Sequence, residues 1–192
     1  MTDTVIGADG VARCGWGAEP QIYREYHDRE WGRELRGDDA LFERLCLEAF
    51  QSGLSWLTIL RKREAFRRAF KGFVITEVAE FTRADEQRLL ADASIVRNRA
   101  KIAAAIANAR VAAELPLSDL LWSFAPQARR RPRSFAEVPA TTPESTALAK
   151  ELKRRGFRFV GPTTAYALMQ ATGMVDDHLT DCHVPGRDGI SA

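Results

Sequence analysis

Two amphipathic helical patterns, joined by one glycine turn, constrain the fold of this chain more than any other stretch of its sequence. The first begins near Asp38, a residue type that favours the N-cap position. Its apolar residues recur at the spacing of one buried helix face, namely Leu41, Phe42, Leu45, Cys46 and Ala49. Gln51-Ser52-Gly53 interrupts this pattern, and Ser55 can cap a second helix. We therefore predict helices at residues 38–50 and 55–70 with a tight turn between them.

A carboxylate, an indole and several cations converge on that turn. Glu48 lies one turn beyond Leu45, at the edge of the apolar face, and Trp56 opens the second helix. Basic side chains follow at Arg61, Lys62, Arg63, Arg67 and Arg68. Such a set can hold a flat cation, stacked on Trp56 with its charge balanced by Glu48, while the basic residues bind a polyanion. The alternative is structural, with Trp56 in the core, Glu48 paired with an arginine and the basic residues solvated. The residues alone leave both interpretations open.

The overall composition is that of an ordinary soluble globular protein. Of its 192 residues, 45% are hydrophobic and 28% are charged, and the net charge is only +2, so any surface for nucleic acid must be local. Basic residues cluster at 61–68, 97–101, 129–133 and 150–158. No apolar run is long enough to span a membrane, and the first residues lack the basic and apolar regions of a signal peptide. We expect a cytoplasmic protein whose three cysteines are reduced.

The rest of the chain also has helical patterns, without an internal repeat or a ladder of strands. Further helices are predicted at about 23–31, 76–81, 85–91, from a turn near residue 98 to Glu114, and at 117–124, 143–155 and 162–172. Residues 1–12 are expected to be a flexible lead-in, residues 126–143 an exposed proline-rich loop with a basic run, and residues 185–192 a tail. The predicted fold class is all-α.

The segment from Asp92 to Ile102 places basic and amide side chains at a tight connection between two helices. These side chains are Arg97, Asn98, Arg99 and Lys101. Helical hairpins in many DNA-binding folds offer backbone N–H groups and basic side chains to a phosphate. An ordinary connection between helices has the same pattern, because such turns are common in helical proteins.

Cysteine and histidine residues near the two ends of the chain have the spacing of a metal site. Twelve residues separate Cys14 from His27, and three separate His178 from Cys182, so the second pair fits one turn. Two thiolates and two imidazoles form a closed tetrahedral zinc set, which is structural because it leaves no open position. By spacing alone His183 is an alternative ligand, and a fold without metal is equally compatible with the pattern.

Six motifs along the chain resemble those of one protein family. They are Arg13-Cys14-Gly15-Trp16, Tyr26-His27-Asp28-x-Glu30-Trp31-Gly32, Leu47-Glu48-x-x-Gln51-Ser52-Gly53-Leu54-Ser55-Trp56, Ile95-Val96-Arg97-Asn98-Arg99-x-Lys101-Ile102, Arg155-Gly156-Phe157-x-Phe159-Val160-Gly161-Pro162-Thr163, and Asp177-His178 ahead of Cys182. In order and spacing they closely resemble the bacterial 3-methyladenine DNA glycosylase I family, over about residues 12 to 184. The chain departs from the family's pattern at Ser94, where the hairpin commonly has glycine, and at Ala49, where glycine often follows the pocket glutamate.

The resemblance implies an all-α helix-hairpin-helix DNA glycosylase fold in one domain, residues 13–184. Its N- and C-terminal segments, 13–37 and 174–184, flank a helical body at 38–173. A structural zinc ion would join these two segments through Cys14, His27, His178 and Cys182. We expect the protein to act as a monomer, in the bacterial cytoplasm and on the nucleoid when it is bound to DNA.

The same resemblance implies hydrolysis of the N-glycosidic bond of N3-methyladenine in alkylated double-stranded DNA, with the free base as product. Glu48 corresponds to the catalytic residue of the base pocket, and the other pocket residues are Trp56, Tyr26, Trp16 and, nearby, Tyr23. The expected DNA contacts are Gly53 and Leu54 at the turn, with Leu54 as a candidate wedge, and Arg97, Asn98, Arg99 and Lys101 at the hairpin.

The chemistry of this lesion agrees with the set of residues around Glu48. A base methylated at N3 carries a positive charge, so its bond to the sugar is weak and discrimination must come from the pocket. Neutral adenine leaves Glu48 without a charged partner, at a cost on the order of 1–3 kcal/mol. A cationic ring on Trp56 gains roughly 0.5–2 kcal/mol over a neutral one. The nucleotide must first rotate out of the duplex, which costs less for a damaged pair.

Two other functions are compatible with parts of the sequence. One is a non-catalytic helix-hairpin-helix DNA-binding module that uses the same basic residues. The other is a zinc-dependent hydrolase such as a base deaminase. The sequence argues against the deaminase, because it has no His-x-Glu motif with Pro-Cys-x-x-Cys and because four protein ligands leave no position for a water molecule on the metal.

Overall fold

The prediction of a mainly helical chain is confirmed. The computed structural model describes residues 3–127 and 130–186. Its α-helices are α1 (Gln21–Arg29), α2 (Asp38–Gln51), α3 (Trp56–Ala69), α4 (Ile75–Ala79), α5 (Arg83–Ala91), α6 (Arg99–Ala112), α7 (Leu117–Trp122), α8 (Pro143–Arg154) and α9 (Pro162–Ala171). Short 3-10 turns lie at Gly15–Gly17, Lys71–Phe73 and Phe135–Glu137. No helix in the described part of the chain is long and apolar enough to cross a membrane.

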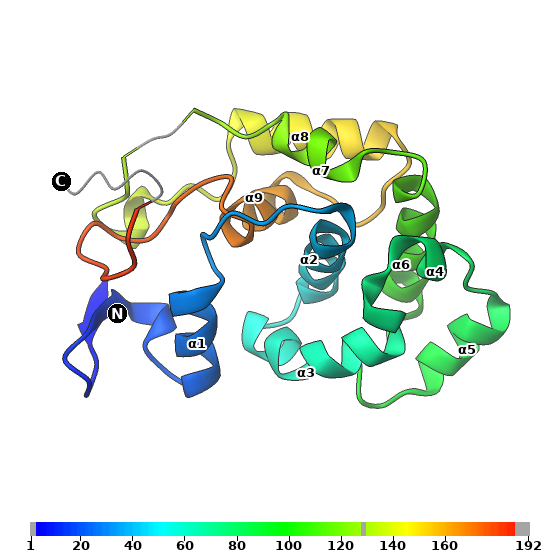
Figure 1. The fold of residues 1–192 in the computed structure, drawn as a ribbon, viewed down its shortest axis with the longest axis horizontal. Coiled ribbons are helices and arrows are strands. Elements are labelled where there is room, and N and C mark those ends of the chain that lie inside the picture. Colours follow the sequence, from blue (N-terminus) through cyan, green and yellow to red (C-terminus); the bar gives the residue numbers. More distant parts are fainter. Residues whose placement is uncertain (1–2, 128–129, 187–192) are drawn as a thin grey trace.

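Helix α2 lies at the centre of the molecule, with α9 to its left, α6 to its right, α7 above it and α3 below it in the view of Figure 1. Its buried residues are Leu41, Phe42, Arg44, Leu45, Cys46, Leu47, Glu48, Ala49 and Phe50. The C-terminal half of α2 is therefore covered on every side instead of along one stripe. The prediction that Glu48 lies at the edge of an apolar face is wrong for this reason, because the neighbouring helices enclose it.

The residues that begin and end the helices follow the predicted signals. The Ser55 hydroxyl accepts a hydrogen bond from the backbone N–H of Thr58 at 3.2 Å and so caps α3. Thr142 caps α8, which has proline in its first turn. Gly53 ends α2 in the left-handed region, with φ +78°, a conformation that side chains with a Cβ rarely adopt. The turn between α2 and α3 is thus set by local sequence.

Two further helical hairpins lie within the described residues, besides the pair formed by α2 and α3. One joins α5 to α6 through residues 92–98, as predicted, and the other joins α8 to α9 through residues 155–161. Asn108 of α6 fixes the second connection, because its amide donates to the Arg158 carbonyl at 3.0 Å and accepts from the Arg158 backbone N–H at 2.8 Å. Phe159 in this connection has φ +57° and is 40% exposed. Ser94, which replaces a glycine, is not among the described residues with positive φ, so the first hairpin does not require glycine there.

The N-terminal segment corrects the predicted absence of strands. Strands β1 (Thr4–Ile6) and β2 (Ala12–Cys14) form an antiparallel hairpin in which Val5 pairs with Arg13. The expectation of a loose lead-in is therefore wrong for these residues, although residues 1–2 lie outside the described part. Strands of three residues are too short for an alternating pattern to be recognised in sequence.

The hairpin of β1 and β2 and the segment at residues 179–184 lie side by side, on the left in Figure 1. The backbone N–H of His183 donates to the Ala12 carbonyl at 2.9 Å, so the C-terminal segment is bonded to β2. Residues 130–143 also contact this region, because Arg131 Nε donates to Asp176 at 2.8 Å. This segment is thus not a free loop, and Arg129 of its predicted basic run lies outside the described residues, as do residues 187–192 of the tail.

Candidate functional site

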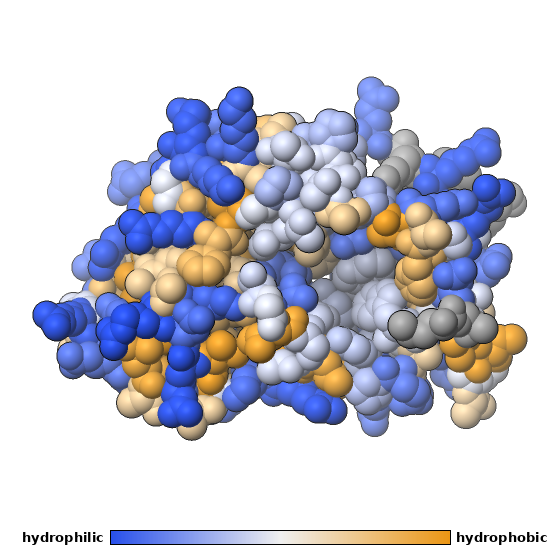
Figure 2. Space-filling model, turned by 180° about the vertical axis from the view of Figure 1, so that it is seen from behind, coloured by the Kyte–Doolittle hydropathy of each residue, from blue (hydrophilic) through white to orange (hydrophobic). Residues whose placement is uncertain are grey.

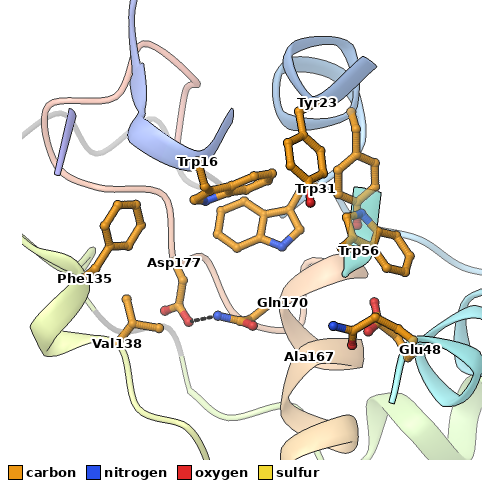
Figure 3. Close-up of a pocket in the computed structure, with 12 residues that line it drawn as sticks. Trp16, Tyr23, Trp31, Glu48, Trp56, Phe135, Val138, Ala167, Gln170 and Asp177 are labelled. Atoms are coloured by element: carbon orange, nitrogen blue, oxygen red, sulfur yellow. Dashed lines mark hydrogen bonds between the residues drawn. The ribbon is translucent and has the colours of Figure 1, made fainter. Parts of the chain in front are cut away.

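A cavity of about 350 Å³ opens between α1, the C-terminal end of α2, the start of α3, and α9. Its lining residues are Trp16, Tyr23, Tyr26, Trp31, Glu48, Gln51, Trp56, Phe135, Val138, Ala167, Gln170 and Asp177. Figure 3 shows Glu48 and Trp56 on one side of this cavity and Phe135 and Val138 on the opposite side. On the face in Figure 2, the surface is hollowed and pale residues of intermediate hydropathy, the class of tryptophan and tyrosine, lie in the hollow. All five residues predicted to form a base pocket line one cavity.

Aromatic rings form most of the cavity wall. Trp16 is at the centre of this group, with edge-on contacts to Tyr23 at 5.8 Å and to Trp31 at 4.9 Å between ring centroids. Tyr26 and Trp56 are 5.4 Å apart and inclined by 47°. The indole Nε1 of Trp56 is buried and has no hydrogen-bond partner within the described residues. The wall therefore suits a flat ring, and it contains a buried donor that is open to a ligand.

Glu48 is 5% exposed and places its carboxylate at this aromatic wall. Burial raises the pKa of Glu48 from its ordinary 4.5 to about 7, and the nearby positive charge of Arg44 partly opposes the rise. A buried carboxylate that ionises near neutral pH is a favourable site for a cation, because a bound positive charge replaces the hydration that the carboxylate has lost.

A polar network behind the wall holds Tyr26 and Arg44 in place. Arg44 Nη1 donates to the Tyr26 hydroxyl at 3.1 Å, and Arg44 Nη2 contacts Glu30 at 3.2 Å. Arg63 of α3 binds the same carboxylate of Glu30 through two hydrogen bonds of 2.6 and 2.8 Å. The sequence did not predict this network, and Arg63, expected among the basic residues that bind a polyanion, is instead paired with Glu30. Because Arg44 is used in this network, the structural alternative in which an arginine pairs with Glu48 does not describe the site.

The opposite wall contains residues that the sequence did not indicate as pocket residues. Asp177 accepts hydrogen bonds from Tyr166 at 2.6 Å and from the Gln170 amide at 2.9 Å. Phe135 and Val138 belong to the segment that was predicted to be an exposed loop. The available signal for this wall was the motif Asp177-His178, since nothing local relates residues 135–138 to the predicted pocket residues, which all lie between Trp16 and Trp56.

The four predicted metal ligands come together at the junction of the two chain ends. The ligand atoms of Cys14, His27, His178 and Cys182 all lie within 4.8 Å of one another, and all four residues are buried. Cys182 Sγ is 3.5 Å from His27 Nε2 and 3.6 Å from His178 Nδ1. Cys14 Sγ is 3.8 Å from His178 Nδ1. A tetrahedral zinc ion with ordinary bond lengths gives S···N separations of about 3.6 Å, so this group fits a metal ion without rearrangement.

The ring nitrogen of each histidine that points away from the group of four has the hydrogen-bond partner typical of a metal-binding histidine. His27 Nδ1 lies 2.8 Å from Asp28 Oδ1, and His178 Nε2 lies 3.0 Å from the Trp31 carbonyl, leaving the inward nitrogens as acceptors. His183, the alternative ligand, contacts Asp28 at 3.0 Å and stands outside the group of four.

The two thiols of this group are linked by a hydrogen bond, so the ionisation of one affects the other. A hydrogen bond with Cys14 lowers the pKa of Cys182 below its ordinary value, and the same hydrogen bond raises the pKa of Cys14. A divalent cation removes this competition, because it stabilises both thiolates.

The predicted DNA contacts divide into two groups. Gly53, Leu54, Arg97 and Arg99 are exposed, and Leu54 is one of the few large apolar side chains on the surface, at 39% exposure. Lys101 is only 7% exposed, and its ammonium donates to the Phe50 carbonyl at 2.8 Å and to the Ser52 carbonyl. A phosphate contact requires a side chain that extends toward solvent. The Lys101 side chain instead points to the C-terminal end of α2, where its ammonium makes both hydrogen bonds. The Asn98 side chain caps α6 by accepting from the Lys101 backbone N–H at 3.1 Å.

Comparison with known proteins agrees with this geometry. The family model described as methyladenine glycosylase matches residues 16–185. The chain belongs to this family. The glycosylase is 44% identical over 180 residues to DNA-3-methyladenine glycosylase 1 of Escherichia coli (strain K12), covering 90% of this chain and 96% of that protein. It is 43% identical over 180 residues to the DNA-3-methyladenine glycosylase of Haemophilus influenzae, covering 90% of this chain and 97% of that protein.

Solved structures show the same fold. A crystal structure of a 3-methyladenine DNA glycosylase I matches the glycosylase with a TM-score of 0.85 at 43% identity, over 89% of this chain and 98% of that chain. A structure of 3-methyladenine DNA glycosylase I from Staphylococcus aureus, which concerns 3-methyladenine recognition, matches with a TM-score of 0.86 at 35% identity, over 92% of this chain and 98% of that chain. The predicted family and the glycosylase fold are thereby confirmed.

Proposed function

We propose that this glycosylase hydrolyses the N-glycosidic bond of N3-methyladenine in alkylated double-stranded DNA and releases the free base. The observation that carries the proposal is the buried carboxylate of Glu48 at an aromatic wall, in a cavity whose size suits a purine. The names of the similar proteins support the same substrate. Glu48 is the residue that we assign as catalytic, with Trp56, Tyr26, Trp16 and Tyr23 binding the base.

The pocket selects the damaged base through its charge. The cationic ring stacks on the aromatic wall, which gains roughly 0.5–2 kcal/mol over a neutral ring, and its charge restores a partner to Glu48. Neutral adenine leaves that carboxylate buried and unpaired, at a cost on the order of 1–3 kcal/mol. The two contributions act in the same direction, so the pocket prefers the methylated base by more than either gives alone.

Bond cleavage then needs little from the protein. The C1′–N9 bond breaks with its electron pair moving onto the cationic base, which leaves neutral. Water adds to C1′ and releases a proton. The hydrogen bond from Arg44 to Tyr26 helps to hold the pocket wall in place before the base enters, which lowers the cost of reorganisation.

DNA is bound on the outside of the same turn. We assign Leu54, exposed beside Gly53, as the wedge that fills the space of the extruded nucleotide. Arg97 and Arg99 are exposed at the α5–α6 hairpin and can reach phosphates. The α8–α9 hairpin supports a further backbone contact, because the N-cap residue of α9, Gly161, provides no side-chain cap for the N–H groups of the first turn, which can therefore bind an anion.

We further propose that the metal held by Cys14, His27, His178 and Cys182 is zinc with a structural role. Two thiolates and two imidazoles are a preferred zinc donor set, and the S···N separations suit its bond lengths. When bound, the ion would cross-link the N-terminal segment to the C-terminal segment. Four protein ligands leave no site for a reactive water molecule, which argues against a deaminase.

Incubation of the folded protein with methylated duplex DNA tests the assignment. We expect chromatography to detect free 3-methyladenine in an amount that rises with enzyme concentration and time. We further propose that the protein is cytoplasmic and acts as a monomer. A non-catalytic DNA-binding module would retain the DNA and release no base. Protein that is folded, binds methylated DNA and yields no free base would therefore contradict the proposal.

A further inference from the structure

A buried lysine anchors the turn that carries Leu54. Lys101, in the first turn of α6, donates from Nζ to the carbonyl oxygens of Phe50, at 2.8 Å, and of Ser52. These two carbonyls flank Gln51, the last residue of α2. One ammonium group therefore holds the backbone on both sides of the point where α2 ends, and its charge is favourable at the C-terminal end of a helix.

A second lysine makes the reverse connection. Lys62, on α3, donates from Nζ to the carbonyl oxygens of Ala93, at 3.3 Å, and of Ser94, at 2.9 Å. These carbonyls belong to the α5–α6 hairpin, which also carries Arg97 and Arg99. Each of the two turns is thus held by a lysine from the helix that follows the other turn.

The turn of Leu54 has few other attachments. Its backbone N–H donates to the Gln51 carbonyl at 2.7 Å, and the Gln51 amide donates to the Leu54 carbonyl at 3.3 Å. Both bonds are internal to the turn. A Cβ built on Gly53 would meet no atom within 4 Å, so nothing packs against the turn at this position. Among the described hydrogen bonds of residues 50–54, those from Lys101 to the Phe50 and Ser52 carbonyls are the ones that reach α6.

Burial of Lys101 indicates that this anchor is specific. The side chain is 7% exposed, and desolvation lowers the pKa of its ammonium. A lysine is rarely buried unless its charge has a partner. An uncharged residue could also satisfy the carbonyls at the end of α2, so the helix end alone does not require a lysine. Lys101 does not line the base cavity. The ammonium of Lys101 therefore links the two turns and does not contact the bound base.

We propose that Lys101 is a positioning residue for base extrusion, which locks the turn of Leu54 to the α5–α6 hairpin, with Lys62 as the reciprocal link. The inference rests on the proposed wedge role of Leu54. A side chain inserted into a duplex is pushed back by the tendency of the bases to restack. When the wedge and the phosphate-binding hairpin form one rigid unit, that force is transmitted to the DNA backbone and the wedge keeps its place.

The proposal separates base extrusion from base binding. In Lys101→Met we expect single-turnover excision from methylated duplex DNA to fall at least about tenfold, because the nucleotide must be extruded. Excision from methylated single-stranded DNA, and the Kd for free 3-methyladenine measured by tryptophan fluorescence, should each change less than about threefold. Equal losses on duplex and single-stranded DNA, or no loss on duplex DNA, would overturn the proposal.

Three further variants make the test independent of the folding of one protein. Lys62→Met changes a partly exposed side chain and should give the same duplex-confined loss, of about threefold or more; unaltered duplex excision in this variant also overturns the proposal. Lys71→Met is the matched control, since its exposed ammonium pairs with Glu77 at 3.2 Å, and it should excise at the wild-type rate. Leu54→Ala tests the wedge itself. If it lacks a duplex-confined loss, the wedge assignment fails, whereas a loss there with normal lysine variants refutes only the present inference.

Discussion

Arg44 and Glu48 lie one helical turn apart on α2, both almost fully buried, yet the Arg44 guanidinium makes its hydrogen bonds to Tyr26 and Glu30. Within the described residues Glu48 has a nearby positive charge and no bonded partner. The charge keeps the carboxylate ionisable near neutral pH, and the missing partner leaves it open to a cation. Selection of a charged base depends on this relationship.

Replacing Glu48 with glutamine should weaken base recognition without unfolding the protein. The amide keeps the shape but removes the charge that balances the cationic nucleotide, and it offers the released neutral base an uncharged hydrogen-bond acceptor in place of a charged one. We therefore expect excision from methylated DNA and affinity for free 3-methyladenine each to fall by about tenfold or more, or about 1.4 kcal/mol. Fluorescence titration measures the binding, and circular dichroism should show the same helical content. Glu114→Gln, an exposed change, is the control. Unchanged binding in Glu48→Gln would remove this residue from the pocket.

The pH dependence of excision should follow the ionisation of Glu48. Because burial raises the pKa of Glu48 to about 7, the pocket of the free enzyme becomes negatively charged as pH rises through 7. The methylated nucleotide keeps its positive charge, so kcat/KM on methylated DNA should rise across this range and then level. The rise should be absent from Glu48→Gln; a variant profile identical to the wild-type profile would assign the titration to another group.

Stability should show the opposite pH trend. The folded protein holds a proton on Glu48 up to pH about 7, whereas the unfolded chain releases it near 4.5. The stabilising contribution of this group is complete below 4.5 and is lost as pH rises through 7. Glu48→Gln lacks this loss, so its free energy of unfolding relative to wild type should be higher at pH 8 than at pH 4.5, by on the order of 2–3 kcal/mol. Urea denaturation at both pH values measures the difference.

Cys182→Ser should lose metal and stability together. The ion would hold two segments that otherwise share a small apolar cluster and scattered hydrogen bonds, so its loss should lower Tm by several degrees and release zinc from a stoichiometric complex. Elemental analysis and thermal denaturation check both effects. His183→Ala is the matched control and should keep its metal, since His183 stands outside the group of four. Full zinc in Cys182→Ser would require a different ligand set.

Arg97→Ala should weaken DNA binding uniformly. Its side chain is exposed at the α5–α6 hairpin, and a phosphate contact there carries no sequence information. Affinity should fall alike for unrelated duplexes, and the slope of log K against log salt should decrease by about one. Fluorescence anisotropy at several salt concentrations measures this slope. A loss confined to one DNA sequence would exclude a phosphate role.

The sequence was most informative where a structural feature is local. Gly53 and the Ser55 cap predicted the turn between α2 and α3, and both have the expected roles. It was misleading where a side chain binds a helix that is distant in the sequence. Lys101 has the spacing of a phosphate contact, but its ammonium binds the end of α2, because α6 packs against that helix. Nothing within α6 indicates this.

The sequence by itself determined the helices, the chemistry of the metal ligands and the family, since capping residues, helical periodicity and motif order are all properties of neighbouring residues. Only the tertiary structure decided that Phe135, Val138, Gln170 and Asp177 complete the pocket, that Arg44 supports Tyr26 and that Glu48 is enclosed. The physical reason is that burial and electrostatic environment arise from segments that are remote in the chain. A carboxylate acquires a raised pKa from what covers it, and its local sequence does not specify that cover.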